Sequence, residues 1–314
     1  MTVIKECRGL SDRQAFFSFS KKMGYRPAER RYIRSYLCTG GPRAVMLLAV
    51  KNGRAVGRLY TWQGADGHGY FALAEGEREA LHLLLERMEA FHEKLGSRDI
   101  FGPVFPDGAG VFTGTCAEYA GGGRGLFVSP SDTTAAEELE KAGFAAEECY
   151  DSYTVRVPRE NEYALLARRA SERFGVKLRV LSHGFFGMTA ADAVFSVDPQ
   201  GADAAARNAE KLKGVFLRGA CAAAVDRDGE VIGYVLCARG EPVRVMTIIT
   251  KDVPLRPCAV LLLASFVTDE LIKRGAETAE LSVINEKNGA SSAFAEQLNG
   301  VKKGRYVEYY KKLT

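Results

Sequence analysis

The 314-residue chain is long enough for two ordinary domains, and its 46% hydrophobic and 26% charged residues are typical of a soluble globular protein. No apolar run reaches membrane-spanning length, and residues 1–20 mix charges with aromatics, so we expect neither a membrane span nor a signal peptide. The net charge of +4 is mild and forms no basic stripe, which argues against nucleic-acid binding.

Seven cysteines are scattered along the chain, and none is in a C-x-x-C pair. This odd number without paired spacing favours reduced thiols in a cytoplasmic protein, and it argues against a zinc site.

The first half begins with a patchy apolar periodicity that predicts a helix over 12–36. A β-hairpin with glycine in its turn is expected at Ala49–Gly57, and a strand at 69–74 leads into a helix over 77–95. Gly96 should end that helix in a left-handed conformation. The remaining expected elements are a strand at 99–104, a glycine-rich loop at 107–125, a short helix at 133–142 and a strand at 150–157.

Pro158 and the charged residues after it predict a boundary between domains at 1–158 and 159–314. The second half should contain a helix at 163–174, a strand at 177–181, a mostly helical segment at 182–219, a hairpin at 224–233, a strand at 243–250, a helix at 259–274, a strand at 278–284, a helix at 290–298 and a strand at 305–311.

The two halves therefore carry the same order of elements, which predicts one fold used twice. The hairpin Ala49–Gly57 matches Ala224–Gly233, and each is followed by a strand, a long helix, a glycine and another strand. We expect an α/β (α+β) architecture of mostly antiparallel mixed sheets with helices on both faces.

This order and several short motifs resemble the GNAT superfamily of N-acetyltransferases. Leu281-Ser282-Val283, then Asn288-Gly289-Ala290 and the closing Tyr306–Tyr310, resemble the family's C-terminal pattern. Leu139–Phe144 resembles its "LEKxGF" step in the first half, and Phe101-Gly102-Pro103 before a glycine-rich loop is similar to a little-characterised bacterial group of tandem GNAT proteins.

The resemblance implies acetyl-CoA or CoA as cofactor and no metal. In the family, backbone N–H groups of a loop before a helix bind the pyrophosphate, where the helix dipole adds to the attraction. The cofactor-binding residues implied for this sequence are Thr247, Ile248, Ile249, Arg256, Cys258, Ala259, Val260 and Asn288. The loop departs from the family pattern because Leu261 replaces a small residue and Pro257 lacks an N–H donor.

By the same resemblance, Tyr309 or Tyr306 is the candidate general acid and Glu241 the candidate base. Each has a plainer interpretation, since tyrosines also pack on sheet faces and Glu241 can be a solvated turn residue. Asn288 can likewise be a helix N-cap. Cys258 lies beside Arg256, which should lower its thiol pKa, but no histidine is recognisably paired with it.

In the first half, the corresponding loop carries Glu75, Glu77 and Glu79. Carboxylates there would occupy the positive end of the helix dipole and repel a pyrophosphate. We interpret residues 1–158 as a pseudo-domain that does not bind the cofactor.

The leading hypothesis is an acyl-CoA-dependent N-acyltransferase with its site in the second half and a small-molecule amine or peptide as acceptor. The degenerate loop also supports a catalytically silent protein that binds a different small ligand in the cleft between the halves. An aminoacyl-tRNA-dependent peptidyltransferase is less consistent with the mild charge. We expect no nucleic-acid or membrane partner, and the sequence indicates neither the acceptor nor the oligomeric state.

Overall fold

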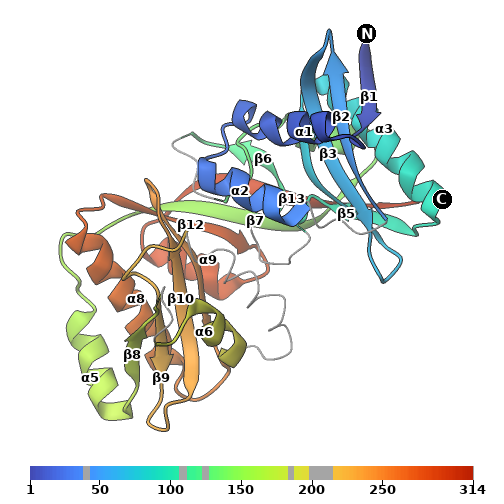
Figure 1. Cartoon of the computed structure of the whole chain (residues 1–314). Helices are drawn as coiled ribbons and strands as arrows, with labels where there is room; N and C mark the ends of the chain where they lie inside the picture. The colour runs from blue at the N-terminus through green and yellow to red at the C-terminus, as the bar shows by residue number, and fades with distance from the viewer. Residues whose placement is uncertain (38–42, 106–111, 122–126, 183–186, 198–214, 314) are drawn as a thin grey trace. The chain divides into compact units, whose positions relative to one another are not determined.

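The computed structural model describes residues 1–37, 43–105, 112–121, 127–182, 187–197 and 215–313 (Figure 1). The chain forms two compact units. The first unit comprises Met1–Ser152, Val283–Gly289 and Lys302–Thr314, and the second comprises Tyr153–Ser282 and Ala290–Val301.

The first unit contains the elements expected for the first half in their expected order, and it adds two strands that the sequence did not predict, at residues 2–6 and 115–119, and one strand from the end of the chain. Its elements are β1 (Thr2–Glu6), α1 (Leu10–Lys22), α2 (Pro27–Leu37), β2 (Ala44–Lys51), β3 (Arg54–Gln63), β4 (Gly69–Gly76), α3 (Arg78–Leu95), β5 (Asp99–Gly102), β6 (Thr115–Tyr119), α4 (Thr134–Lys141), most of β7 (Ala145–Arg156) and nearly all of β13 (Val301–Lys312).

The sheet of this unit is mixed. Strands β1 to β4 are successive antiparallel neighbours, whereas β4 and β5 are parallel. Strand β13, from the end of the chain, pairs antiparallel with both β5 and β6, and β7 lies on its other side. The unit therefore obtains one of its central strands from residues far along the chain, so that the compact units differ from two consecutive halves that meet at Pro158.

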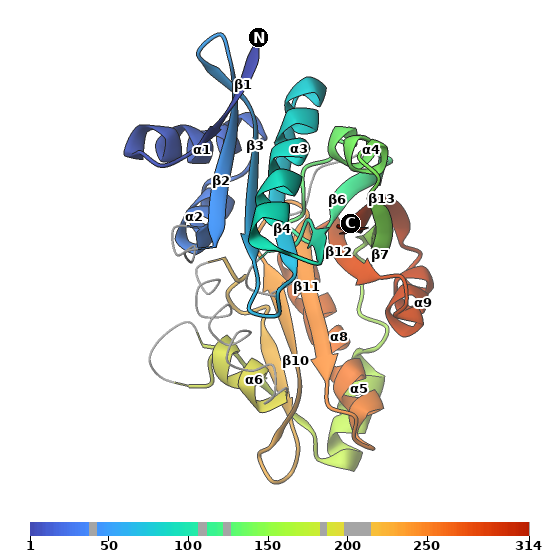
Figure 2. The ribbon, with the colours of Figure 1, turned by 90° about the vertical axis from the view of Figure 1, so that its right-hand side faces the viewer.

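Helices cover both faces of this sheet. Figures 1 and 2 show α1 and α2 on one side of β2 and β3, and α3 on the other. Apolar side chains of α3 at three- and four-residue spacing are buried, and they share a core with Leu139 of α4 and with Val307 and Tyr309 of β13. The helix ends at Gly96, whose φ of 69° is left-handed, as the sequence predicts.

The second unit contains α5 (Ala164–Phe174), β8 (Lys177–Val180), α6 (Ala190–Val197), β9 (Ala222–Val225), β10 (Val231–Ala238), β11 (Val243–Thr250), α8 (Arg256–Lys273), most of β12 (Thr278–Asn285) and most of α9 (Gly289–Gln297). Strands β8 to β11 are antiparallel neighbours in sequence order, and β11 pairs with β12 in parallel. Every residue of β9 and β10 is buried, so these strands form the centre of the unit.

Several boundaries differ from the expectation for physical reasons. The helix expected over 12–36 is two helices, because Gly24 takes a left-handed φ of 73° and Pro27 begins the second one. Strand β6 lies within the segment expected to be a glycine-rich loop. Parts of that expected loop, at 107–111 and 122–125, lie outside the described residues. The same holds for residues 183–186 and 198–214 of the segment expected to be mostly helical.

Within the described ranges, no helix combines the length and the apolar character needed to cross a membrane. The same ranges contain no group of three or more histidine, cysteine, aspartate or glutamate side chains arranged to hold a metal ion.

Candidate functional site

The second unit has a parallel strand pair that ends before its strands do. β11 and β12 are in register only from Val243 with Ala279 to Val245 with Leu281, although β11 continues to Thr250. The pairing of β11 with β10 shifts at the same level, which leaves Met246 as the extra residue of a bulge. The open end of the pair therefore lies along the C-terminal part of β11, which includes Thr247, Ile248 and Ile249.

Helix α8 begins a few residues beyond this open end, at Arg256. No side chain caps its first turn. The N–H of Arg256 donates to the Val253 carbonyl (2.9 Å), the N–H of Ala259 donates to the Leu255 carbonyl (3.0 Å), and Pro257 has no N–H. In this turn the N–H of Cys258 is therefore the backbone hydrogen-bond donor without an acceptor among the described residues, and it lies at the positive end of the helix dipole.

The predicted residues around this helix end differ in exposure. Arg256 has 54% of its side chain exposed, and its guanidinium lies 3.5 Å from the exposed Asp252 carboxylate, a contact that solvent weakens. Ile249 is 41% exposed, whereas Cys258 and Ala259 are buried. Burial raises the pKa of the Cys258 thiol, so the expected lowering by Arg256 is wrong and the thiol stays protonated at neutral pH.

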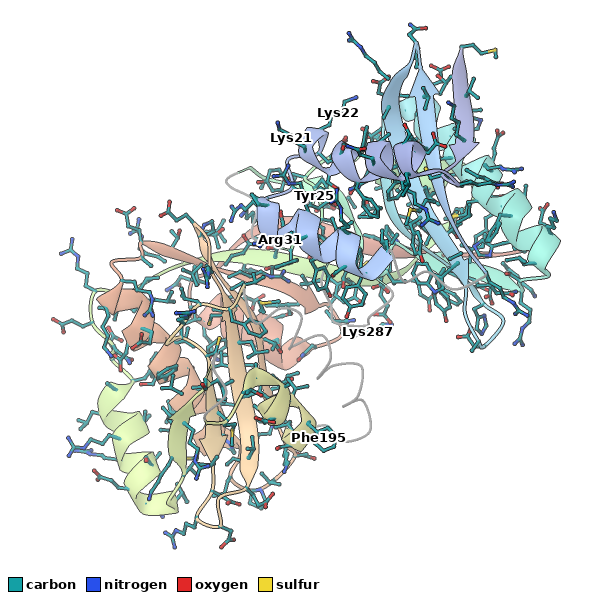
Figure 3. All side chains as sticks on the ribbon, in the orientation of Figure 1. Lys21, Lys22, Tyr25, Arg31, Phe195 and Lys287 are labelled. Atoms are coloured by element: carbon teal, nitrogen blue, oxygen red, sulfur yellow. The ribbon has the colours of Figure 1, made fainter. Side chains whose placement is uncertain are left out.

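The first unit repeats the arrangement. β4 and β5 pair in parallel only at Gly69 with Ile100 and Tyr70 with Phe101, and α3 begins beyond the end of β4. A groove of about 690 Å³ lies beside this helix end. It is lined by Phe19, Lys22 and Met23 from the end of α1, by Gly76, Glu77 and Arg78, and by Pro130, Ser131, Asp132 and Thr134 before and within α4. Figure 3 labels Lys22 at the end of α1 and Tyr25 between α1 and α2.

Acidic residues at the start of α3 are matched by cations. Glu77 lies 3.5 Å from Lys22, and Glu79 lies 2.8 Å from Lys51. Glu75, expected beside them, is instead buried at the end of β4. The carboxylates of this helix end therefore have partners of their own.

Both units thus contain an antiparallel hairpin, a strand with an irregular register, a parallel partner that pairs only briefly, and a helix beginning at the open end. No protein-family model and no curated protein sequence matches the chain. Among solved structures, it is similar to a tandem GNAT protein from the clavulanic acid biosynthesis pathway, with a TM-score of 0.64, 12% identity and coverage of 99% of this chain and 98% of that one. The chain has a tandem GNAT fold.

Two further solved structures are similar to nearly the whole chain. One is a GCN5-related glucosamine N-acetyltransferase region of a fungal multi-domain GH3 β-N-acetylglucosaminidase, with a TM-score of 0.65 and 12% identity over 99% of this chain and 38% of that one. The other is a GCN5-related N-acetyltransferase from Sphaerobacter thermophilus, with a TM-score of 0.56 and 15% identity over 99% and 95% of the two chains. These identities show the fold alone, and the fold expected from the sequence is confirmed.

The two tyrosines that the sequence suggests as general acid, Tyr309 and Tyr306, lie in the first unit. Tyr309 is 1% exposed in its core, and its hydroxyl donates to the Glu140 carboxylate (2.9 Å). Burial, with Glu140 nearby, raises its pKa. Tyr306 is on the other face of β13, packed with Cys116 and Val128. These contacts favour the packing role that the sequence left open.

The other two candidates lie at the ends of elements. Glu241 is exposed and precedes β11, an eight-residue strand about 26 Å long, and the first turn of α8 follows the other end of that strand. The structure therefore does not bring it together with Arg256. Asn288 is exposed, and its N–H donates to the Asn285 carbonyl (2.8 Å) in the turn before α9.

Sequence reasoning missed three buried polar residues at the parallel pair. Arg244 and Glu280 are register partners on β11 and β12, with 2% and 1% of their surface exposed. Ser282 follows on β12, 5% exposed. The available signal was a polar residue flanked by apolar ones on a strand expected to be buried.

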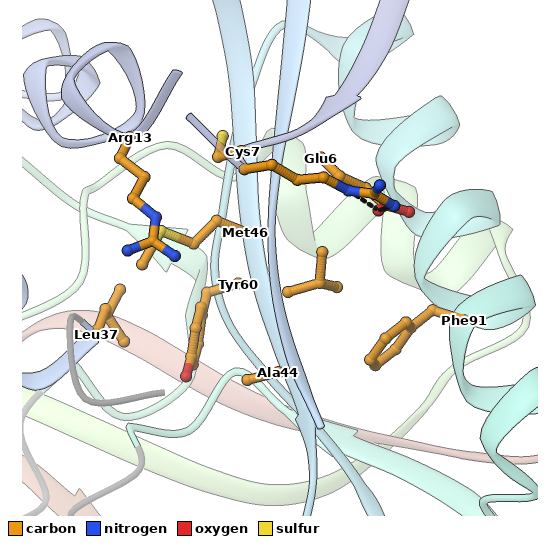
Figure 4. Close-up of a pocket in the computed structure, with 10 residues that line it drawn as sticks. Glu6, Cys7, Arg13, Leu37, Ala44, Met46, Tyr60 and Phe91 are labelled. Carbon is orange, nitrogen blue, oxygen red and sulfur yellow. Dashed lines mark hydrogen bonds and ion pairs between the residues drawn. The ribbon is translucent and has the colours of Figure 1, made fainter. Parts of the chain in front are cut away.

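A separate pocket of about 360 Å³ lies in the first unit (Figure 4). Arg13 and Tyr60 line it, together with Glu6, which pairs with Arg8 (2.8 Å). Burial raises the pKa of both Tyr60 and Cys7 to about 12, so neither lining group is a nucleophile at neutral pH. None of the predicted site residues lines this pocket.

Proposed function

We propose that this protein is an acyl-CoA-dependent N-acyltransferase whose donor binds in the second unit, along the C-terminal part of β11 and at the first turn of α8. The observation that carries the proposal is the meeting of an interrupted parallel pair with an uncapped helix N-terminus. The acyl donor is an extended molecule with phosphates at one end. Its binding requires an open strand edge along which it can lie and positive charge of the protein beside its phosphates, and this part of the unit supplies both.

The residues present fit such a donor. The Arg256 guanidinium is exposed and only loosely paired with Asp252, so a phosphate can replace that carboxylate in a charge-assisted hydrogen bond. The Cys258 N–H adds a backbone donor, and Ile249 offers exposed apolar surface beside the strand edge. When bound, the donor supplies an activated thioester carbonyl for attack by an amine.

A second candidate function is a ligand-binding protein without transferase activity. Pro257 favours it, because this residue leaves the first turn one N–H short of what a diphosphate would use. A protein of either function would bind a CoA-like ligand or a related anion. Only the transferase would also form an amide.

Calorimetry with CoA and acetyl-CoA tests the donor site. Arg256→Gln should weaken binding by about tenfold or more, because a charge-assisted hydrogen bond is lost. Arg78→Gln is the matched control, since Arg78 begins α3 of the first unit and is also 54% exposed. Equal losses in the two variants, or no binding by the wild type, would refute the assignment to the second unit. An amine screen by mass spectrometry then separates transferase from silent binder.

A further inference from the structure

Ser282 carries a buried hydroxyl that has no hydrogen-bond partner among the residues that the structure describes. The residue is 5% exposed on β12, between Leu281 and Val283. Buried hydroxyls in folded proteins are nearly always paired, because losing water without gaining a partner costs free energy. An unpaired one therefore points to a partner that is not among the described residues.

The position of Ser282 says where that partner would lie. The last register pair of β11 and β12 is Val245 with Leu281, so Ser282 is the first residue of β12 beyond the pairing. The residue of β11 at that level is Met246, the extra residue of the bulge. Ser282 thus lies at the point where the backbone pairing of β11 with β12 stops, which we call the apex of this strand pair.

The same geometry sets the distance to the helix. The five residues of β11 from Met246 to Thr250 span about 13 Å between their first and last Cα atoms, and a short loop follows before α8 begins. A donor with its phosphates at Arg256 and its arm extended along β11 would bring its far end, which carries the acyl group, toward the apex.

We propose that the Ser282 hydroxyl donates a hydrogen bond to the carbonyl oxygen of the donor's acyl group and so positions the thioester. The inference rests on the proposed function. Ser282 acts here as a positioning residue: it fixes the direction of the carbonyl, and no covalent bond to the serine is involved.

The test uses Ser282→Ala, with Ser265→Ala as a matched control. Ser265 is also a buried serine of the second unit, 3% exposed, but its hydroxyl is paired with Asn161 (2.9 Å). Without ligand, Ser282→Ala should keep or raise the melting temperature, because an unpaired polar group is removed, whereas Ser265→Ala should lower it.

Calorimetric titration gives the second readout. Ser282→Ala should lower the affinity for acetyl-CoA by about tenfold and leave the affinity for CoA within about twofold, because CoA has no acyl carbonyl. Ser265→Ala should change neither. Ser282→Cys, nearly equal in volume and a weak donor, should fall between wild type and alanine, and it serves if the alanine variant does not fold.

Three results would overturn the inference. Unchanged acetyl-CoA affinity in Ser282→Ala, or equal losses for CoA and acetyl-CoA, would refute the contact while leaving the proposed function standing. A wild-type protein that binds neither ligand would refute both.

Discussion

Arg58 and Glu75 form an ion pair of 2.8 Å inside the first unit, with the Arg58 side chain fully buried. The guanidinium also donates to Ser20 (2.7 Å) and to the Phe16 carbonyl (3.1 Å), and the Glu75 carboxylate accepts from the Tyr25 hydroxyl. Strands β3 and β4 are thereby joined to helix α1 by a polar network with most of its groups satisfied.

Removing one partner of this pair should be costly. Arg58→Met should lower the free energy of unfolding by about 3–5 kcal/mol, because it leaves Glu75 buried without its counter-charge. The double variant Arg58→Met, Glu75→Leu should lose less free energy of unfolding than the single variant Arg58→Met, since neither charge remains buried. Urea unfolding measures both, and a double variant less stable than Arg58→Met would contradict this account.

Tyr309→Phe separates packing from catalysis. Loss of the hydrogen bond to Glu140 should cost about 1 kcal/mol of stability in urea unfolding, with the ring still in the core. Acyl transfer to an identified amine should stay near the wild-type rate. A fall in turnover of about 100-fold at unchanged stability would instead support Tyr309 as general acid.

Deleting residues 301–314 should unfold the first unit. It removes β13 from between β5 and β7, and it takes Val307 and Tyr309 out of the core. Trp62 is the single tryptophan of the chain, lies on β3 and stacks on Tyr70 at 5.5 Å, so its fluorescence reports this unit. Its emission should shift to the red in the truncated protein.

A synthetic peptide of residues 300–313 provides the control. Added in excess, it should restore the native emission of Trp62, because binding to the folded state shifts the equilibrium. Native fluorescence in the truncated protein without peptide would show that β13 is dispensable.

His92 should make the protein less stable in mild acid. The ring is fully buried between Thr61 and Ser97, and burial lowers its pKa to about 4. Because the unfolded chain has a histidine pKa of about 6.5, it binds a proton below that pH which the folded state does not. His92 should therefore lower the free energy of unfolding by about 2 kcal/mol between pH 7 and pH 5. The test is the free energy of unfolding of wild type and of His92→Gln at both pH values, because only the wild type should show this loss.

Glu308 should act in the opposite direction. Burial, then the charges of Glu148 and Glu147, raise its pKa to about 7, although the Tyr150 hydroxyl donates to it (3.2 Å). The folded state therefore takes up a proton as the pH falls through 7, before the unfolded chain does at about 4.5, and stability is gained over that window. Compared with wild type, Glu308→Gln should lack a gain of about 2 kcal/mol between pH 7 and pH 5 in urea unfolding.

Local patterns allowed the fold to be predicted in large part. The stripe of leucines on α3 and the turn at Asn52-Gly53, where both residues take positive φ, follow from rules that act over a few residues. The repeat of these signals in the second half then indicated a tandem fold before any strand order was known.

Strand partners were not predictable in the same way. The residues of β13 read as a strand, but pairing with β5 joins Tyr309 to Gly102, and no local pattern encodes contacts between residues so distant in sequence. For the same reason the sequence did not single out Arg58 or Ser282 as buried polar residues, since it did not show what lay opposite their side chains.

The position of β13 also bears on synthesis of the protein by the ribosome. Domains usually fold as units in the order in which they are translated. Here β5 must wait for residues 309–312 before its edge is covered. The nascent chain therefore carries an incomplete sheet with an open edge through translation of the whole second unit, and chaperones would meet it in that state.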